Sequence, residues 1–296
     1  MMLRTPPSSA GLAHAVKAAA LVGLTALAAC GFTPSGAGDG DGGIDAADVD
    51  AAPSDGRPPL DGPPGVDART DAPPAVAFCP SGESALVLCL PFDDGTTTNR
   101  VSNGPQPFLS TNVTPVAGRV GLAAGLGATS ALWFEEAPAL DIASPFTIEM
   151  FVYYTQDPPT TGASGDRRVG LLDNDSQYSL FLGWHPPVGS TTDAVTPYCN
   201  ANSTAWGPPA SRDAWHHVAC VHSGTTLTVY VDGVPGVPVG ATTAVGTGGQ
   251  NGTTLGQNGD GDVTTPSVPL IGRLDEVRLW NGVARSALEI AAAAAR

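Results

Sequence analysis

Glycine and proline recur along the whole chain and divide it into short segments. Of its 296 residues, 37 are glycine and 28 are proline. Glycine weakens helices and proline interrupts their hydrogen bonding, so long helices are excluded. Between these breaks, apolar and polar residues alternate with a period of two, as in strands with one buried face. The sequence therefore predicts an all-β protein built from short strands.

The alternation is clearest in seven segments after residue 80. In 146–154, for example, Ile148, Met150 and Val152 share one face, and Glu149 and Tyr153 share the other. The predicted strands are 84–92, 146–154, 168–173, 177–184, 215–222, 225–232 and 272–280. Many short strands of this kind favour an antiparallel β-sandwich.

One segment, 286–295, has the pattern of a helix. Ser286 is a candidate N-cap, because a serine hydroxyl accepts hydrogen bonds from backbone N–H groups of the first turn. Leu288 and Ile290 are the apolar residues that we expect to anchor this helix to the core.

Residues 1–30 have the pattern of an export signal. Arg4 and Lys17 precede a small, apolar run from Ala18 to Ala29. This run is too short for a membrane-spanning helix, which needs about 20 apolar residues, but it suits a signal peptide. It ends in Leu27-Ala28-Ala29-Cys30, which resembles the lipobox of bacterial lipoproteins.

That resemblance implies cleavage before Cys30 and a diacylglycerol on its thiol, which would anchor the protein to a membrane without a transmembrane helix. Gly31 in place of aspartate favours the outer membrane, by resemblance to Gram-negative sorting. The alternative is an ordinary signal peptide with a chance cysteine.

Residues 31–77 have the composition of a disordered linker. They hold nine aspartates against Arg57 and Arg69, and most of the remainder is glycine, proline and alanine. Such a segment buries too little apolar surface to offset its ordering entropy, and its charges repel one another. We expect a tether that holds the folded domain clear of the membrane. A calcium loop is the alternative for its aspartates, but the spacing and closing glutamate of an EF-hand are absent.

Residues 78–296 are predicted to form the folded domain, and several of its segments resemble one family. These segments are 88–93 (LCLPFD), 146–152 (FTIEMFV), 215–219 (WHHVA), 227–233 (LTVYVDG) and 271–280 (IGRLDEVRLW). They resemble, in order and spacing, the LamG-like jelly rolls of the concanavalin A-like lectin/glucanase superfamily. The resemblance implies two packed antiparallel sheets of six or seven strands each. It also implies ligands on the concave sheet or on the loops at its rim.

The same resemblance implies a structural calcium ion. In LamG-like domains, an aspartate after the opening strand and the aspartate of the closing block often meet at such a site, and these match Asp93 and Asp275. Asn103 or Gly104 would add a carbonyl oxygen, since calcium takes six to eight oxygen ligands. The chain departs from the family here, because it lacks the usual acidic residue before Ser-Gly. Alternatively, Asp275 and Glu276 pair with Arg273 or Arg278.

Four cysteines lie in the predicted domain, and four cysteines allow three disulfide connectivities. Their order along the chain favours Cys79–Cys89, closing a short loop onto the first strand, and Cys199–Cys220, tying neighbouring strands. Disulfides are the expected state of an exported chain. A metal site and a catalytic thiol are the alternatives.

Aromatic residues cluster between 178 and 206, at Tyr178, Trp184, Tyr198 and Trp206. Exposed rings would form a platform for sugars or a protein partner, whereas buried rings would only fill the core. Our candidate ligand residues are Trp184, Tyr198 and Trp206. Trp206 is the best placed for a loop, because Gly207-Pro208-Pro209 follows it.

Catalytic patterns are weak. A glycosidase needs two carboxyl groups across the scissile bond, and the Glu-x-Asp-x-Glu strand of the related glucanases is absent: Phe151 and Tyr153 follow Glu149 at the corresponding spacing. There is no Gly-x-Ser-x-Gly elbow. His216 and His217 are neighbours on a strand, so they point to opposite faces and suit no zinc site.

The formal net charge of −15 excludes a general nucleic-acid binder, which needs a basic face. The sequence therefore predicts an exported, lipid-anchored, non-catalytic module that binds a glycan or an extracellular protein. The alternatives are a polysaccharide-active enzyme and a structural or adhesion protein.

Overall fold

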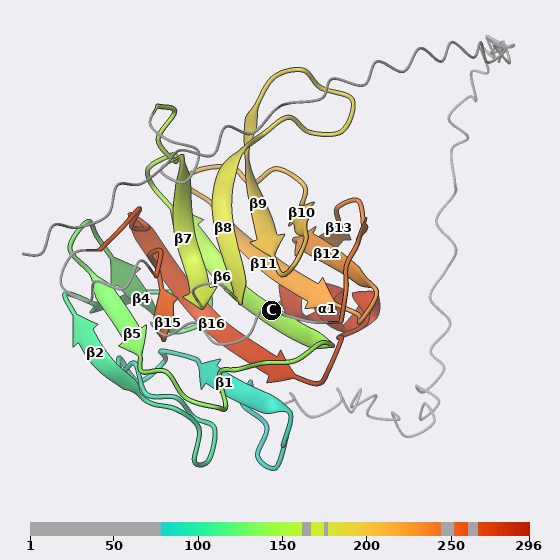
Figure 1. Cartoon of the computed structure of the whole chain (residues 1–296). Coiled ribbons are helices and arrows are strands. Elements are labelled where there is room, and N and C mark those ends of the chain that lie inside the picture. Colours follow the sequence, from blue (N-terminus) through green and yellow to red (C-terminus); the bar gives the residue numbers. More distant parts are fainter. Residues whose placement is uncertain (1–77, 162–166, 175–176, 244–251, 260–265) are drawn as a thin grey trace, which may run out of the picture. The chain divides into compact units, whose positions relative to one another are not determined.

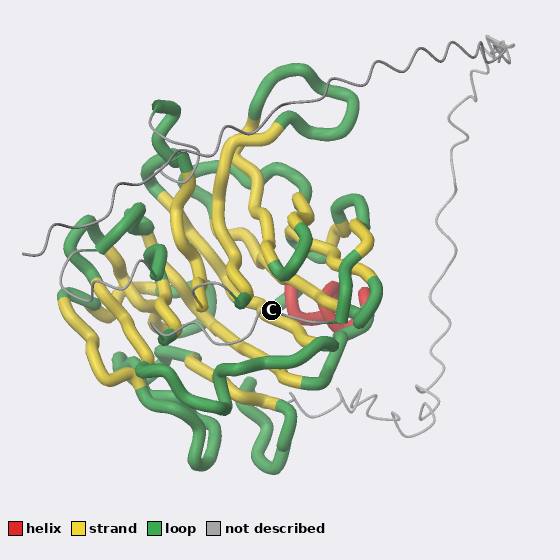
Figure 2. The backbone as a smooth tube through the Cα atoms, in the orientation of Figure 1, coloured by secondary structure: helices red, strands yellow, loops and turns green. Residues whose placement is uncertain are grey.

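The structure is a computed structural model, and it describes residues 78–161, 167–174, 177–243, 252–259 and 266–296. These residues form two antiparallel sheets and one short helix (Figures 1 and 2), which confirms the predicted jelly-roll sandwich with its C-terminal helix. The predicted signal segment with Cys30 and the predicted tether 31–77 lie outside the described residues.

The larger sheet has nine strands within the described residues. Its main path runs β13 (Val234–Pro235), β12 (Thr226–Val231), β11 (Trp215–His222), β6 (Phe146–Tyr154), β16 (Gly272–Asn281), β4 (Leu122–Leu126) and β3 (Thr114–Ala117). Off this path, β1 (Leu86–Leu90) pairs with β16, and β14 (Val239–Gly240) pairs with β12.

The smaller sheet has seven strands within the described residues. Their order is β10 (Thr204–Trp206), β9 (Ala194–Asn200), β8 (Tyr178–His185), β7 (Arg168–Asn174), β15 (Thr253–Leu255), β5 (Ala131–Phe134) and β2 (Pro107–Thr111). Figure 1 shows β7, β8 and β9 in front of β6, β11 and β16 of the larger sheet.

The core lies between the two sheets. Ile148 of β6 and Val218 of β11 meet Leu180 of β8 in one cluster of buried residues. Because side chains alternate along a strand, the residues between these positions point away from the core. The sandwich therefore has two outer faces, one on each sheet, and a functional site can be built on either.

Helix α1 (Ala287–Ala294) covers part of the outer face of the larger sheet (Figure 2). Ser286 caps it as predicted: its side chain accepts a hydrogen bond from the Glu289 N–H. Ile290 is buried against Ala219 and Val221 of β11. The predicted role of Leu288 as an anchor is wrong, because this residue is 83% exposed. Two positions apart on a helix differ by about 200° around the axis, so Leu288 and Ile290 cannot share a face.

Both disulfides favoured by the order of the cysteines are present. Cys79 is bonded to Cys89, and Cys199 is bonded to Cys220. The prediction that the second bond ties neighbouring strands is wrong, because Cys199 lies on β9 of the smaller sheet and Cys220 on β11 of the larger sheet. It crosses the core and links the two sheets.

Candidate functional site

An aromatic row crosses the outer face of the smaller sheet. Phe181 of β8 stands directly opposite Tyr198 of β9, which stands opposite Trp206 of β10. The Phe181 and Tyr198 ring centroids are 5.5 Å apart, and those of Tyr198 and Trp206 are 4.4 Å apart. Directly opposed residues on antiparallel strands lie close enough for such contacts. The register of three strands therefore places these rings side by side.

Gly183 makes room for this row. It lies on β8 between Phe181 and His185, and a Cβ at this position would stand 2.8 Å from Cε1 of Tyr198 and 3.4 Å from Cη2 of Trp206. The two rings thus lean over the bare backbone of a glycine. In this position the Trp206 ring stacks on His185, with centroids 4.4 Å apart and an interplanar angle of 25°.

Burial keeps the polar members of this face neutral. It lowers the pKa of His185 below the ordinary 6.5, against the opposing influence of Asp193. It also raises the pKa of Tyr198 above 10.0. At neutral pH an uncharged imidazole therefore lies against the Trp206 ring, so this face offers aromatic surface with hydrogen-bonding edges.

A groove of about 630 Å³ opens beside Trp206, and we call it the proline groove. The segments after β8, after β10 and after β13 form its walls. Its lining residues are His185, Pro186, Pro187, Val188, Trp206, Gly207, Pro208, Pro209, Pro235, Gly236, Val237, Pro238 and Val239. The segment after β10 can pack closely on β12, because a Cβ at Gly207 would stand 2.8 Å from Cγ1 of Val229.

Of the three predicted ligand residues, the structure brings Tyr198 and Trp206 together and places Trp184 elsewhere. Trp184 packs against the core cluster, and its Nε1–H donates to the Pro158 carbonyl at 2.9 Å. Sequence reasoning missed His185 and Phe181. The alternation of side chains along the strand could have found them. If Leu182 and Trp184 face the core, Phe181 and His185 must face the other side of the sheet.

The predicted calcium residues Asp93 and Asp275 meet at the turn between β3 and β4. Both oxygens of the buried Asp275 carboxylate are used: Oδ2 accepts the N–H groups of Arg119 at 2.8 Å and Val120 at 3.0 Å, and Oδ1 accepts the Glu276 N–H at 2.8 Å. Burial raises the pKa of Asp275 to about 6, although these three hydrogen bonds act to lower it.

Two glycines let this turn approach the carboxylates. A Cβ at Gly118 would stand 2.6 Å from Oδ2 of Asp275, and a Cβ at Gly121 would overlap Oδ1 of Asp93. Asn103 lies apart from them. Its neighbour Gly104 packs beside Val87 near the start of β1, whereas Asp93 follows the end of that strand. The structure thus assembles two of the three predicted calcium residues.

The alternative prediction, that Asp275 and Glu276 pair with Arg273 or Arg278, is wrong: the structure contains other pairs. Glu276 pairs with Arg296, at 2.9 Å between Oε2 and Nε. Arg273 donates to the Ala117 carbonyl, and Arg278 pairs with Glu149. Within the ranges that the structure describes, no group of three or more His, Cys, Asp or Glu side chains is arranged to hold a metal ion. Calcium at this turn would therefore need backbone oxygens as well.

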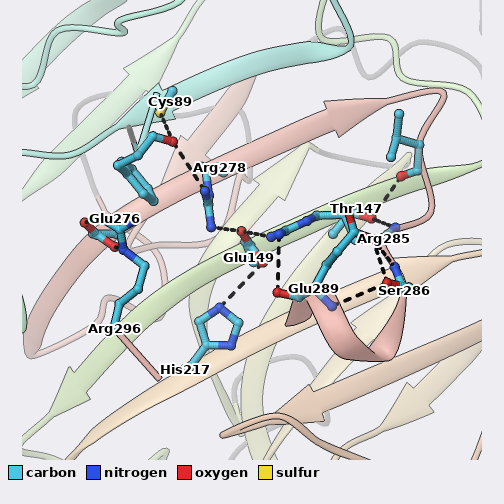
Figure 3. Close-up of polar contacts among 12 residues, drawn as sticks. Cys89, Thr147, Glu149, His217, Glu276, Arg278, Arg285, Ser286, Glu289 and Arg296 are labelled. Atoms are coloured by element: carbon cyan, nitrogen blue, oxygen red, sulfur yellow. Dashed lines mark hydrogen bonds and ion pairs between the residues drawn. The ribbon is translucent and has the colours of Figure 1, made fainter. Parts of the chain in front are cut away.

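Glu149, the carboxylate at the centre of the larger sheet, is bound in a buried ion network (Figure 3). Arg278 and Arg285 both contact its Oε1, and His217 lies 3.6 Å from Oε2. Burial acts to raise the pKa of Glu149, but the contact with His217 and the two guanidinium charges outweigh it and lower the pKa. A carboxylate fixed in this way serves to hold elements together, and it is poorly suited to proton transfer.

His216, on the opposite face of β11, stands between Ser211 and Asp232. Its Nδ1 lies 2.7 Å from Asp232 Oδ2, and its Nε2 lies 3.0 Å from Ser211 Oγ. This order matches a nucleophile, a base and an orienting acid. However, the Ser211 backbone N–H also donates to Nε2 at 3.0 Å, so it occupies the lone pair that a general base needs. The arrangement is best explained as a structural contact that holds β11 to the end of β12.

A family model described as the concanavalin A-like lectin/glucanases superfamily matches residues 126–291. No curated protein sequence matches the chain. In the part of the chain that the structure describes, none of the helices combines the length and the apolar character needed to cross a membrane.

Several solved structures share the fold. One is domain 4 of AbnA, a GH43 extracellular arabinanase from Geobacillus stearothermophilus, in complex with arabinotriose: its TM-score is 0.52 at 17% identity, over 71% of this chain and 98% of that one. The binding domain of Paraclostridial Mosquitocidal Protein 1 has a TM-score of 0.52 at 14% identity, over 71% and 52% of the two chains.

A third similar structure comes from botulinum neurotoxin type C, whose cell entry depends on two ganglioside molecules. Its TM-score is 0.50 at 10% identity, over 71% of this chain and 51% of that one. The chain thus spans about half the length of the two toxin structures. At these identities, the likenesses show a shared fold.

Proposed function

This chain belongs to the concanavalin A-like lectin/glucanases superfamily, and from that premise we propose that it is a non-catalytic binding module for carbohydrate. The ligand would lie in the proline groove, beside the aromatic row of the smaller sheet. The fold alone does not fix this function, so the proposal depends on the site.

The observation that carries the proposal is the Trp206 ring on the wall of the proline groove. The groove volume of about 630 Å³ lies within the roughly 300–1,000 Å³ of known ligand clefts. The C–H face of a sugar ring packs well on an aromatic ring. His185 and the backbone of the proline segments would supply hydrogen bonds to the hydroxyl groups. Of the ligands named for the similar structures, arabinotriose is an oligosaccharide, and a ganglioside is a lipid with an oligosaccharide headgroup.

The test is a binding screen of the full chain against soluble polysaccharides and oligosaccharides, with arabinotriose and ganglioside headgroups included. We expect at least one glycan to bind, and the Trp206→Ala variant to bind it at least about tenfold more weakly, a loss of about 1.4 kcal/mol. Trp215→Ala is the matched control, because Trp215 packs on Tyr153 of the larger sheet. Equal affinity in the Trp206→Ala variant would overturn the proposed site.

An extracellular protein is the second candidate ligand. Val188 and Val237, both in the groove lining, are 89% and 59% exposed. Exposed apolar side chains around an aromatic anchor also suit a protein interface. Binding of a protein partner that is lost in Trp206→Ala, without binding of any glycan by the folded chain, would favour this candidate.

The absence of catalysis belongs to the same proposal. The arginines around Glu149 and the backbone contact at His216 both argue against a reacting group at these positions. Incubation of a bound polysaccharide with the full chain is expected to release no new reducing ends. Release of reducing ends that the Glu149→Gln variant loses would support the polysaccharide-active enzyme instead.

We further propose that the protein is exported and anchored by a lipid on Cys30, in the outer membrane. The two disulfides support export, because such bonds persist in oxidising compartments. Labelling of bacteria with an alkyne-tagged fatty acid tests the anchor. We expect label on the full chain and none on its Cys30→Ser variant. Equal labelling of the two would contradict lipidation at Cys30.

A structural calcium ion at the turn between β3 and β4 is also a proposal. The carboxylates of Asp93 and Asp275 and the carbonyl groups of the glycine turn are hard oxygen ligands, which calcium prefers. Bound calcium would neutralise the buried charge of Asp275. We expect a chelator to lower the melting temperature of the full chain, and calcium to restore it. An unchanged melting temperature would contradict the proposal, and Asp94→Asn, next to the site, is the control variant.

A further inference from the structure

A second hollow lies on the outer face of the smaller sheet, near the other end of the aromatic row. Its volume is about 260 Å³, and its lining includes Arg168 and five amide side chains: Asn174, Gln177, Asn200, Asn202 and Asn258. We call it the amide pocket. Phe181 belongs to its lining and also contacts Tyr198, which contacts Trp206 of the proline groove. The aromatic row therefore connects the two hollows.

Polar atoms of the amide pocket are left without partners. Gln177 is only 5% exposed, and its Nε2 donates to the Asp141 carboxylate, but its Oε1 has no hydrogen-bond partner among the residues that the structure describes. Within the same described ranges, the buried Nε of Arg168 has no hydrogen-bond partner either. An unpaired buried polar group is costly, and native proteins contain few of them. Two such groups beside one hollow indicate a place where a ligand completes the hydrogen bonding.

The charges of the described lining residues balance. Arg168 is the cation, held 4.2 Å above the Phe181 ring and hydrogen-bonded through Nη2 to Oδ1 of Asn258 at 2.7 Å. Asp173 is the anion, and its Oδ2 accepts the Gly259 N–H at 2.7 Å. The described lining therefore carries no net charge, which suits a neutral ligand better than an ion.

The amide groups define the ligand chemistry. An amide offers a carbonyl acceptor and an N–H₂ donor at its tip, and a sugar hydroxyl both donates and accepts, so the two match. The pocket volume lies below the roughly 300 Å³ at which clefts for drug-sized ligands begin. Its size therefore suits one ring. Resting on the proposed glycan-binding function, we propose that the amide pocket is a second sugar site that takes one neutral sugar residue.

The test uses saturation-transfer NMR on the full chain with free D-glucose, D-galactose and L-arabinose, and with D-glucuronate as the anionic probe. We expect saturation of at least one neutral sugar and none of glucuronate. The Gln177→Ala and Asn200→Ala variants should bind that sugar at least about tenfold more weakly. Gln156→Ala, an exposed amide outside the pocket, is the matched control and should bind normally.

Trp206→Ala separates this proposal from the proposed function, because Trp206 lines only the proline groove. We expect it to keep the monosaccharide signal and lose oligosaccharide binding. Loss of the monosaccharide signal in Trp206→Ala alone would place that sugar in the groove and overturn the second site. Preference for glucuronate, or no signal from any neutral sugar while oligosaccharides still bind, would overturn it too. If neither kind of sugar binds the folded chain, both proposals fail. Gln177→Ala also loses the contact with Asp141, which could impair folding. Asn200→Ala leaves that contact intact, so it tests the pocket independently.

Discussion

At the residue scale, the candidate site depends on a glycine. Gly183 has an ordinary strand conformation, so its missing side chain matters for space: a Cβ would stand too close to the Tyr198 ring, at 2.8 Å, and in contact with the Trp206 ring, at 3.4 Å. Cross-strand ring contacts of this kind contribute about 0.2–1 kcal/mol each.

Gly183→Ala is therefore expected to displace the Tyr198 ring and, with it, the contact between Tyr198 and Trp206. Overpacking of this kind costs about 1–3 kcal/mol of unfolding free energy. We expect a lower melting temperature, altered near-ultraviolet circular dichroism and weaker glycan binding. Gly240→Ala is the matched control, since nothing lies within 4 Å of a Cβ there. If both variants behave like the wild type, the packing described for Gly183 is wrong.

Single residues also show where sequence reasoning stops. Trp206 was expected on a loop because Gly207-Pro208-Pro209 follows it, but the structure makes it the last residue of strand β10. The orientation of Trp184 was decided by its packing against the core. Phe181 and His185 were implied by alternation but needed the register between β8, β9 and β10 to become part of a site. The unpaired Gln177 Oε1 has no signal in the sequence at all, because it depends on what surrounds it in space.

At the scale of elements, the last helix is fastened to the larger sheet by charge as well as by packing. Arg285 precedes α1 and reaches Glu149 of β6, and its guanidinium lies 4.8 Å from the Trp280 ring centroid. Arg296, after α1, pairs with Glu276 of β16. These contacts hold the start of the helix to β6, which is distant in sequence, and its end to β16, which directly precedes it (Figure 3).

Glu149→Gln is expected to lower the unfolding free energy at pH 7 by about 3 kcal/mol, because Arg278 and Arg285 lose their buried partner. The pKa of Glu149 is lower in the folded state than its ordinary 4.5, so the unfolded chain binds more protons between these two values. The stabilisation by Glu149 is therefore present above pH 4.5 and is lost as the pH falls through the folded-state pKa.

Denaturant unfolding at a series of pH values checks this. The difference between wild type and Glu149→Gln should be largest near neutral pH and should shrink on acidification. Glu135→Gln, at an exposed glutamate, is the control. It should change neither the unfolding free energy nor its dependence on pH. A difference that grows on acidification would have the wrong sign for the network described here.

Loss of the helix N-cap is expected to lower the stability by a smaller amount. Ser286→Ala removes the side-chain oxygen that accepts the Glu289 N–H, and N-caps are worth about 1 kcal/mol. We expect thermal unfolding to show that loss. Leu288→Ala, at an exposed position of the same helix, should change stability by less than about 0.5 kcal/mol. The reverse order would mean that α1 packs through Leu288.

Long, regularly alternating strands were predictable, and short irregular ones were not. The prediction for 146–154 and 215–222 matches β6 and β11, because both strands are long and alternate regularly. Strands β2, β3 and β9 were missed, since each contains a proline and β2 and β3 bury little. The bulge at Asp275, where the β16 register shifts, depends on its partner strand β6.

At the scale of the whole molecule, the two sheets are joined by one covalent bond through the core. Cys199–Cys220 links β9 to β11 at a sequence separation of 21, whereas the sequence separation of Cys79 and Cys89 is 10. The family resemblance predicted two packed sheets, but which strands the bond joins depends on how the sheets stack. That arrangement is a tertiary property, and strand periodicity carries no information about it.

Removal of the inter-sheet bond by Cys199→Ala with Cys220→Ala is expected to lower the unfolding free energy by about 3 kcal/mol, through the greater entropy of the unfolded chain. The Cys79–Cys89 bond closes a shorter loop. Its removal by Cys79→Ala with Cys89→Ala should therefore lower the unfolding free energy by less. Denaturant unfolding of both double variants gives the comparison. A larger loss from the Cys79–Cys89 pair would show that loop entropy does not govern these bonds.

The central claim is that the outer face of the smaller sheet binds glycan through Trp206. The most direct test is the indole N–H spectrum of the five tryptophans during titration with the glycan found by the binding screen, with Trp206 assigned by Trp206→Phe. The account predicts that the Trp206 signal shifts as the glycan binds, while those of Trp184 and Trp215 stay in place. Binding that moves other tryptophans and leaves Trp206 unchanged would contradict it.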